Sequence, residues 1–120
     1  MTYVDGFVIA VPTANKDRFI ETARKFDTML IEHGALRVME CWGDDLKHGK
    51  LTDFYRATHA TDAETVAFSW VEWPDKASRD AAHAKMEELM SSGAEAMDMP
   101  FDGARMIFGG FVPVLELKGR

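Results

Sequence analysis

Residues 3–12 form a predicted strand with apolar side chains on both of its faces. The segment is rich in β-branched and aromatic residues and ends at Pro12, which cannot donate a hydrogen bond to a neighbouring strand. Side chains alternate between the two faces of a strand. One face here carries Tyr3, Phe7, Ile9 and Val11, and the other carries Val4, Val8 and Ala10. A strand with one solvated face alternates apolar with polar residues, so this sheet needs apolar cover on both sides.

Residues 105–115 repeat this pattern as a second predicted strand. Ile107 and Phe111 face one way, and Met106, Phe108 and Val112 face the other. The Gly109-Gly110 pair lies inside the strand and matches no phosphate-loop spacing, so it indicates a bulge or a close backbone contact.

Two amphipathic helices and two further strands complete the chain. The first helix begins after Asn15, places Phe19, Ala23, Phe26 and Leu30 at helical spacing, and stops at Gly34. The second begins after Asp75 and stops at Gly93. Residues 36–42 and 65–73 have strand composition. Residues 43–45 mark a turn, and residues 46–62 form a loop with one helical turn near residues 52–56.

The resulting order is β-α-β-loop-β-α-β, the ferredoxin-like arrangement of the α+β class, in one domain covering residues 1–120. Right-handed crossovers place both helices on one face of a four-stranded antiparallel sheet of strand order 4-1-3-2. Two helices cannot cover all the apolar area, and a twofold sheet-to-sheet contact is the simplest closed solution. We therefore predict a homodimer through the open sheet face.

Composition restricts the classes of partner. The chain has 14 Lys and Arg against 20 Asp and Glu, a net charge of -6 that argues against nucleic-acid and membrane partners. The single Cys41 excludes an internal disulfide, and the N-terminus lacks the basic and apolar regions of a signal peptide. These features favour a cytoplasmic protein.

Five sequence blocks carry a family resemblance over nearly the whole chain: YVDGF, MECWGDD, LTDFYRATHA, FSWVEWPDKASRD and PFDGARMIFGGF. They resemble the YbaA-like family, domain of unknown function 1428. The resemblance implies the dimeric α/β-barrel superfamily, in which two ferredoxin-like subunits pack sheet against sheet. It implies no activity, and we assign no cofactor and no catalytic residue.

Each predicted strand carries one charged residue on a largely apolar side: Asp5, Glu40, Glu72 and Arg105. Such groups are rarely buried without a partner. We expect Glu72 and Arg105 to approach each other across the first strand, at the mouth of a pocket floored by Trp42 and Trp70. This site would orient a small carboxylate or phenolic ligand. The alternative is a structural ion pair or a bridge across the dimer interface.

Glu40 and Glu72, if close, would form a carboxylate pair in which burial and like charge raise one pKa, as acid–base chemistry at neutral pH requires. Alternatively, each faces a different edge or accepts hydrogen bonds from backbone amides. The five candidate ligand-binding residues are thus Glu40, Trp42, Trp70, Glu72 and Arg105.

Other polar groups give weaker indications. The loop residues Asp44, Asp45, His48 and Asp53 match no defined metal spacing, so we predict no metal site. Cys41 has no neighbouring histidine or second cysteine and is predicted to be a buried, inert thiol. We expect His33 and His83 on the surface, and only His59 is a candidate acid or base.

Two functional hypotheses follow. The first is a small-molecule-binding homodimer, or an enzyme without a cofactor, acting on a small aromatic or carboxylate compound. The second is a non-catalytic structural or interaction dimer with a filled interface. A ligand binder must retain a cavity, whereas a structural dimer fills it.

Overall fold

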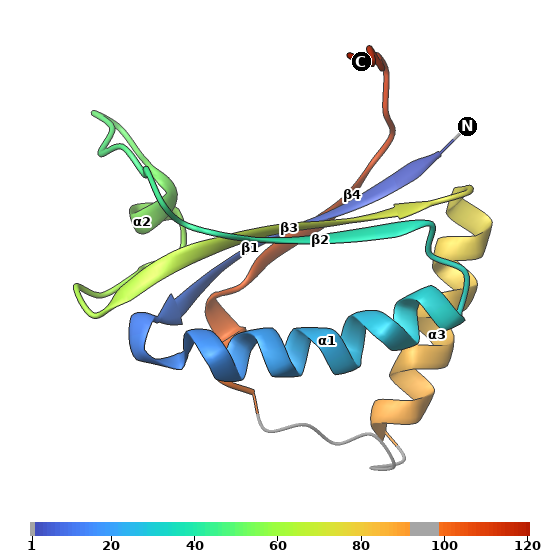
Figure 1. The fold of residues 1–120 in the computed structure, drawn as a ribbon, viewed down its shortest axis with the longest axis horizontal. Helices are drawn as coiled ribbons and strands as arrows, with labels where there is room; N and C mark the ends of the chain where they lie inside the picture. The colour runs from blue at the N-terminus through green and yellow to red at the C-terminus, as the bar shows by residue number, and fades with distance from the viewer. Residues whose placement is uncertain (1, 92–98) are drawn as a thin grey trace.

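The computed structural model describes residues 2–91 and 99–120 and places a four-stranded sheet against two long helices (Figure 1). The elements in chain order are β1 (Tyr3–Pro12), α1 (Lys16–Glu32), β2 (Arg37–Trp42), α2 (Phe54–Ala57), β3 (Glu64–Trp73), α3 (Lys76–Ser91) and β4 (Ile107–Phe111). Short 3-10 turns precede α1 and β4. The predicted β-α-β-loop-β-α-β order is confirmed.

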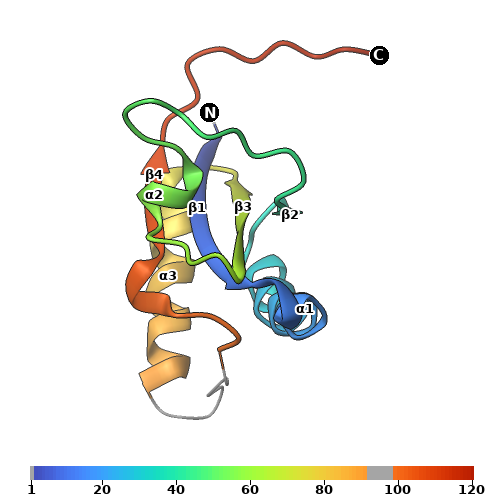
Figure 2. The same cartoon turned by 90° about the vertical axis from the view of Figure 1, so that its left-hand side faces the viewer.

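The strand order is β2-β3-β1-β4, and all three neighbouring pairs are antiparallel. This is the predicted order, read from the other edge. Because β1 and β3 run in opposite directions, Tyr3 pairs with Trp73 and Pro12 pairs with Glu64. Both long helices lie on one face of the sheet, and the C-terminal segment leaves from the other (Figures 1 and 2).

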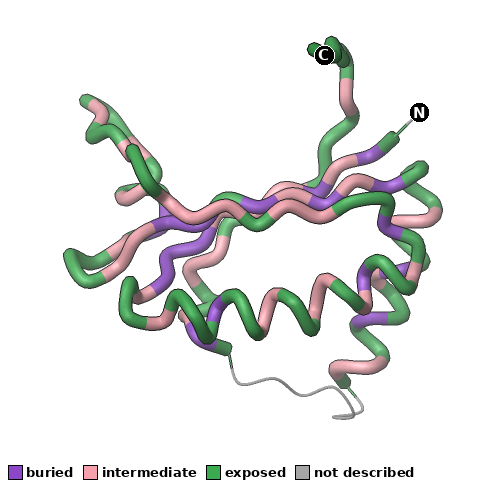
Figure 3. The backbone as a smooth tube through the Cα atoms, in the orientation of Figure 1, coloured by how far each residue is buried: buried purple, intermediate pink, exposed green. Residues whose placement is uncertain are grey.

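The face under α1 and α3, which we call the inner face, carries the core in two clusters. One gathers Leu30, Val71, Trp73 and Met86, and the other gathers Ile9, Val11, Phe19 and Ala67. Figure 3 shows how buried positions alternate along the central strands. The apolar stripe of α1 supplies Phe19 and Leu30 to these clusters, as its spacing predicts.

The opposite face, which we call the outer face, presents Val4, Gly6, Phe68, Trp70, Glu72 and Phe111. Loop 43–63 covers one end of it, where Ala10 and Val66 are buried. There the Phe54 and Phe68 rings pack edge to face, with 6.4 Å between their centroids. Phe68 remains 44% exposed and Phe111 60% exposed. The predicted surplus of apolar area is therefore present within the described residues.

The helix boundaries follow the expected local chemistry with one difference. Gly34 adopts a φ of 112°, which favours glycine, and Asp75 accepts the Ser78 amide at 2.7 Å at the start of α3. Asn15 lies before α1 but does not cap it, because its side chain donates instead to the Pro100 carbonyl at 3.0 Å. The predicted stop at Gly93 lies outside the described residues.

The last strand is shorter than the predicted range 105–115. It ends at Phe111, which already pairs with Val4 near the start of β1, so no partner strand remains for the residues that follow. The register is continuous through Gly109 and Gly110, and therefore contains no bulge. A Cβ at Gly110 would lie 2.3 Å from the Tyr3 hydroxyl, so close packing explains this glycine.

Candidate functional site

A cavity of about 140 Å³ lies between α1 and the inner face of the sheet. Its walls are apolar over most of their extent and join the two core clusters: they include Phe7, Ile9, Phe19, Phe26, Leu30 and Val71. Residues 99–106 contribute Met99, Phe101 and Met106. The hydrogen bond from Asn15 to Pro100 ties this segment to the start of α1.

Two carboxyl groups, Asp27 and Glu40, interrupt this apolar wall. Asp27 lies four residues after Ala23 and three before Leu30, so it occupies the stripe of α1 that faces the sheet. Glu40 lies on the edge strand β2 and pairs in register with Ser69, which is buried on the inner face. The helix and the edge strand thereby bring the two carboxyl groups together.

The Asp27 carboxyl retains its proton at neutral pH. Burial raises its pKa most, a hydrogen bond with Glu40 raises it further, and the Glu40 charge adds to both, giving a pKa of about 9 against an ordinary 3.8. Two carboxyl groups in contact share a proton because both cannot ionise cheaply. This pair can donate a proton and accept one, which are the requirements of acid–base chemistry near pH 7.

The structure separates the five predicted ligand-binding residues. Glu40 and Trp42 lie on the inner face, where the Trp42 ring packs against Phe19 at 5.7 Å. Trp70 and Glu72 lie on the outer face, and the Trp70 indole donates to Glu72 at 2.9 Å. The expected pocket floored by both tryptophans is therefore wrong, and Glu40 and Glu72 face opposite sides of the sheet, as the alternative to a carboxylate pair allowed.

Arg105 pairs with Glu64 instead of Glu72. Its guanidinium makes two hydrogen bonds to the Glu64 carboxylate, at 2.7 and 2.8 Å, and donates to the His59 carbonyl at 2.8 Å. The start of β4 lies beside the end of β1, and antiparallel pairing puts the start of β3 there. The hydrogen bonds from Arg105 lower the pKa of Glu64 to about 2. This is the structural ion pair that the alternative interpretation anticipated, with a different partner.

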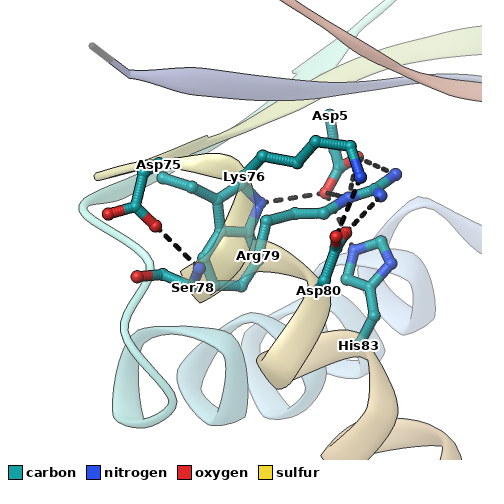
Figure 4. Close-up of polar contacts among 8 residues, drawn as sticks. Asp5, Asp75, Lys76, Ser78, Arg79, Asp80 and His83 are labelled. Atoms are coloured by element: carbon teal, nitrogen blue, oxygen red, sulfur yellow. Dashed lines mark hydrogen bonds and ion pairs between the residues drawn. The ribbon is translucent and has the colours of Figure 1, made fainter.

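Asp5 is the centre of a buried polar network under α3 (Figure 4). Its carboxylate accepts hydrogen bonds from the Trp73 indole at 2.9 Å and from Arg79 at 3.0 Å, and its Oδ2 lies 2.8 Å from His83 Nε2. The Arg79 guanidinium also lies over the Tyr3 ring, 5.3 Å from its centroid. His83 keeps a side chain that is 40% exposed, as expected of a surface residue, but its contact with Asp5 holds it in place. The network compensates the buried charge of Asp5.

The loop between β2 and β3 uses its polar groups internally. Asp53 accepts the Arg56 amide at 2.8 Å and the Gly49 amide at 3.1 Å, and thereby caps α2. These backbone hydrogen bonds and the Arg56 charge lower its pKa. His59 is exposed, with a φ of 53°. Across residues 2–91 and 99–120, no group of three histidine, cysteine or acidic side chains gathers as a metal site would require.

Sequence reasoning missed Asp27, although its position carries a signal. An aspartate inside the apolar stripe of an amphipathic helix must either find a partner or bind a proton.

Cys41 is partly buried, and its position in register opposite Phe68 gives it no acid–base partner among the described contacts. In the part of the chain that is described, no helix is both long and apolar enough to cross a bilayer.

Comparison with known proteins identifies relatives over almost the full length. The chain is 48% identical over 116 residues to the uncharacterized protein YbaA of Escherichia coli K12, covering 97% of this chain and 99% of that protein. The match to YbaA of Shigella flexneri has the same identity and coverage.

A solved structure shares the fold. It is described as a dimeric ferredoxin-like protein from an uncultured marine organism, and it aligns with a TM-score of 0.57 and 11% identity over 97% of this chain and 98% of that one. The fold is thus of the ferredoxin-like α+β type. A family model for a protein of unknown function, DUF1428, matches residues 2–103. With these full-length relatives, the match establishes that the chain belongs to the DUF1428 family.

Proposed function

We propose that this chain is a homodimeric small-molecule-binding protein whose ligand site is the cavity under α1. The observation that carries the proposal is the proton-holding Asp27–Glu40 pair in a wall that is otherwise almost entirely apolar. Ligand pockets typically combine an apolar lining with a few polar groups that set orientation. The alternative, a purely structural dimer, requires no such cavity and no carboxyl pair facing it.

The cavity favours an uncharged ligand of about one aromatic ring. A dry apolar cavity of roughly 150 Å³ can hold benzene, and this one measures about 140 Å³. Among the described residues, no arginine or lysine lines it, and two carboxyl groups facing the cavity disfavour an anionic ligand. The best candidates are therefore phenol-like compounds, whose hydroxyl can donate to Glu40 or accept from Asp27. A carboxylate anchored by Arg105, as the sequence suggested, does not fit this cavity.

A proton transfer within the ligand is the chemistry that this pair supports. The pKa of Asp27 is raised to about 9, and the Glu40 carboxyl group is its hydrogen-bond partner. Such a pair would assist tautomerisation or isomerisation of a ring-sized carbonyl compound without a cofactor. Binding without turnover uses the same contacts.

The homodimer is supported by the outer face. Phe68 and Phe111 are half exposed there beside Trp70, and exposed apolar patches of this kind mark interfaces. The related solved structure is described as dimeric. Two copies packed through these faces would form the dimeric α/β barrel that the family resemblance implies.

The ligand proposal is tested by fluorine NMR with 4-fluorophenol and 4-fluorobenzoate at pH 7. We expect the phenol signal to shift and broaden on addition of the protein, and the benzoate signal to remain unchanged. Ala23→Leu fills the cavity and should abolish the phenol effect, whereas Glu21→Gln, an exposed change on the same helix, should not. Equal binding of phenol by Ala23→Leu, or stronger binding of benzoate, would contradict the proposal.

A further inference from the structure

The C-terminal segment, residues 112–119, is apolar and exposed. It follows β4 as extended chain and makes no strand pairing in the described structure. Val114 is 95% exposed, Leu117 85% and Leu115 76%. Single exposed apolar residues are ordinary on a protein surface, but a contiguous run on an extended chain indicates a binding segment. We call residues 112–119 the C-terminal arm.

The C-terminal arm stands away from the sheet from which it emerges (Figures 1 and 2). A groove of about 1130 Å³ separates the two. One wall is the outer face, with Val4, Phe68, Trp70 and Phe111, and the other wall is the arm itself. The arm therefore leaves its own apolar sheet uncovered while exposing its own apolar residues.

We propose that the C-terminal arms are exchanged between two copies of this chain, each arm lying against the outer face of the other copy. The inference rests on the homodimer of the proposed function and goes beyond it by naming the segment that crosses. A twofold contact needs a patch that is complementary to itself, and the arm with the outer face forms such a patch.

A second copy fits this groove better than other partners. The groove lining is mainly apolar, with only Arg37, Glu72, Glu116 and Lys118 as charged groups, two of each sign. A net charge of -6 disfavours nucleic acid and anionic lipid. The outer face contributes one charge of each sign, Arg37 and Glu72, and the arm contributes Glu116 and Lys118, so in a twofold contact each sign can meet the other.

The first test measures dimer dissociation by sedimentation velocity over a range of protein concentrations. A chain ending at Phe111 should dissociate at least about tenfold more readily than the full chain, because each buried leucine strengthens binding by roughly that factor. A chain ending at Lys118, which loses only Gly119 and Arg120, should match the full chain. In the full-length chain, Leu117→Asp should weaken the dimer and Glu116→Gln should not. Near-UV circular dichroism verifies that each variant is folded.

The second test shows which copy the arm contacts. Leu117→benzoylphenylalanine is prepared in light and nitrogen-15-labelled forms, which are mixed and irradiated. Exchange predicts cross-linked peptide pairs that join a light chain to a heavy one and include residues of β1 or β3. Cross-links confined to single chains would overturn the exchange.

The outcomes separate the two proposals. If the full chain is monomeric at every concentration, the homodimer fails and the exchange fails with it. If the full chain is dimeric but the chain ending at Phe111 dimerises equally well, the exchange alone is wrong and the ligand proposal is unaffected.

Discussion

Replacing Asp27 with asparagine should remove a specific pH dependence of stability. The folded protein holds a proton on Asp27 up to a pKa of about 9, whereas the unfolded chain releases it near 3.8. Between these values the native state binds more protons, so the free energy of unfolding falls as pH rises. Asparagine keeps the shape of a protonated aspartate but does not titrate.

The magnitude follows from the proton count. A full proton difference changes the free energy of unfolding by about 1.4 kcal/mol per pH unit, which sets an upper limit of about 4 kcal/mol between pH 5 and pH 8. Asp27 is only partly buried and Glu40 is exposed, so solvent reduces this value. Between pH 5 and pH 8, we expect the free energy of unfolding of Asp27→Asn to rise by roughly 1–2 kcal/mol relative to that of the wild type.

Urea unfolding at pH 5, 6, 7 and 8 measures this difference. The comparison with Asp27→Asn cancels every contribution that the two proteins share. Glu21→Gln, on the exposed side of α1, should follow the wild type throughout. The shared proton would be refuted if the free energies of unfolding of the wild type and Asp27→Asn changed with pH in parallel. It would also be refuted if the wild type became more stable relative to the variant as pH rises.

Three further changes test the supporting structure by urea unfolding. Gly110→Ala should cost about 1–3 kcal/mol, because its Cβ would meet the tyrosine hydroxyl of β1, whereas Gly103→Ala has open space; equal losses would contradict the packing. The lowered pKa of Glu64, about 2 against 4.5, stabilises the fold above pH 4.5, and this stabilisation is lost as pH falls towards 2. Glu64→Gln should therefore cost roughly 1–2 kcal/mol at pH 7, after allowance for solvent screening of its pair with Arg105, and the cost should shrink below pH 4.5. Asp5→Ala should cost about 3–5 kcal/mol, because it removes the buried acceptor of the Trp73 indole and one of the two carboxylate partners of Arg79; a loss below 1 kcal/mol would mean that the buried network is dispensable.

Hydrophobic pattern and turn chemistry were sufficient to predict the element order and which residues of one strand share a face, and the ferredoxin-like arrangement then implied the strand order. Gly34 and Asp75 mark helix ends because their conformational and hydrogen-bonding preferences are local. The open apolar face was also foreseeable, because β1 and β4 are apolar on both sides.

The site was harder to predict because it depends on register and direction between strands. A shift of one residue moves a side chain to the opposite face, so Trp42 and Trp70 could not be placed together from their own segments. Arg105 was assigned to the wrong glutamate because antiparallel pairing brings the start of β3, and not its end, beside the start of β4.

The central claim is that a ring-sized, uncharged ligand occupies the cavity beside Asp27 and Glu40. A crystal of the protein soaked in 4-bromophenol tests it directly, because the anomalous signal of bromine locates the ligand unambiguously. We predict one bromine peak per subunit between α1 and the inner face, with the phenol oxygen within hydrogen-bond distance of the carboxyl pair. Bromine only on the outer face, or side chains that fill the cavity, would contradict the account.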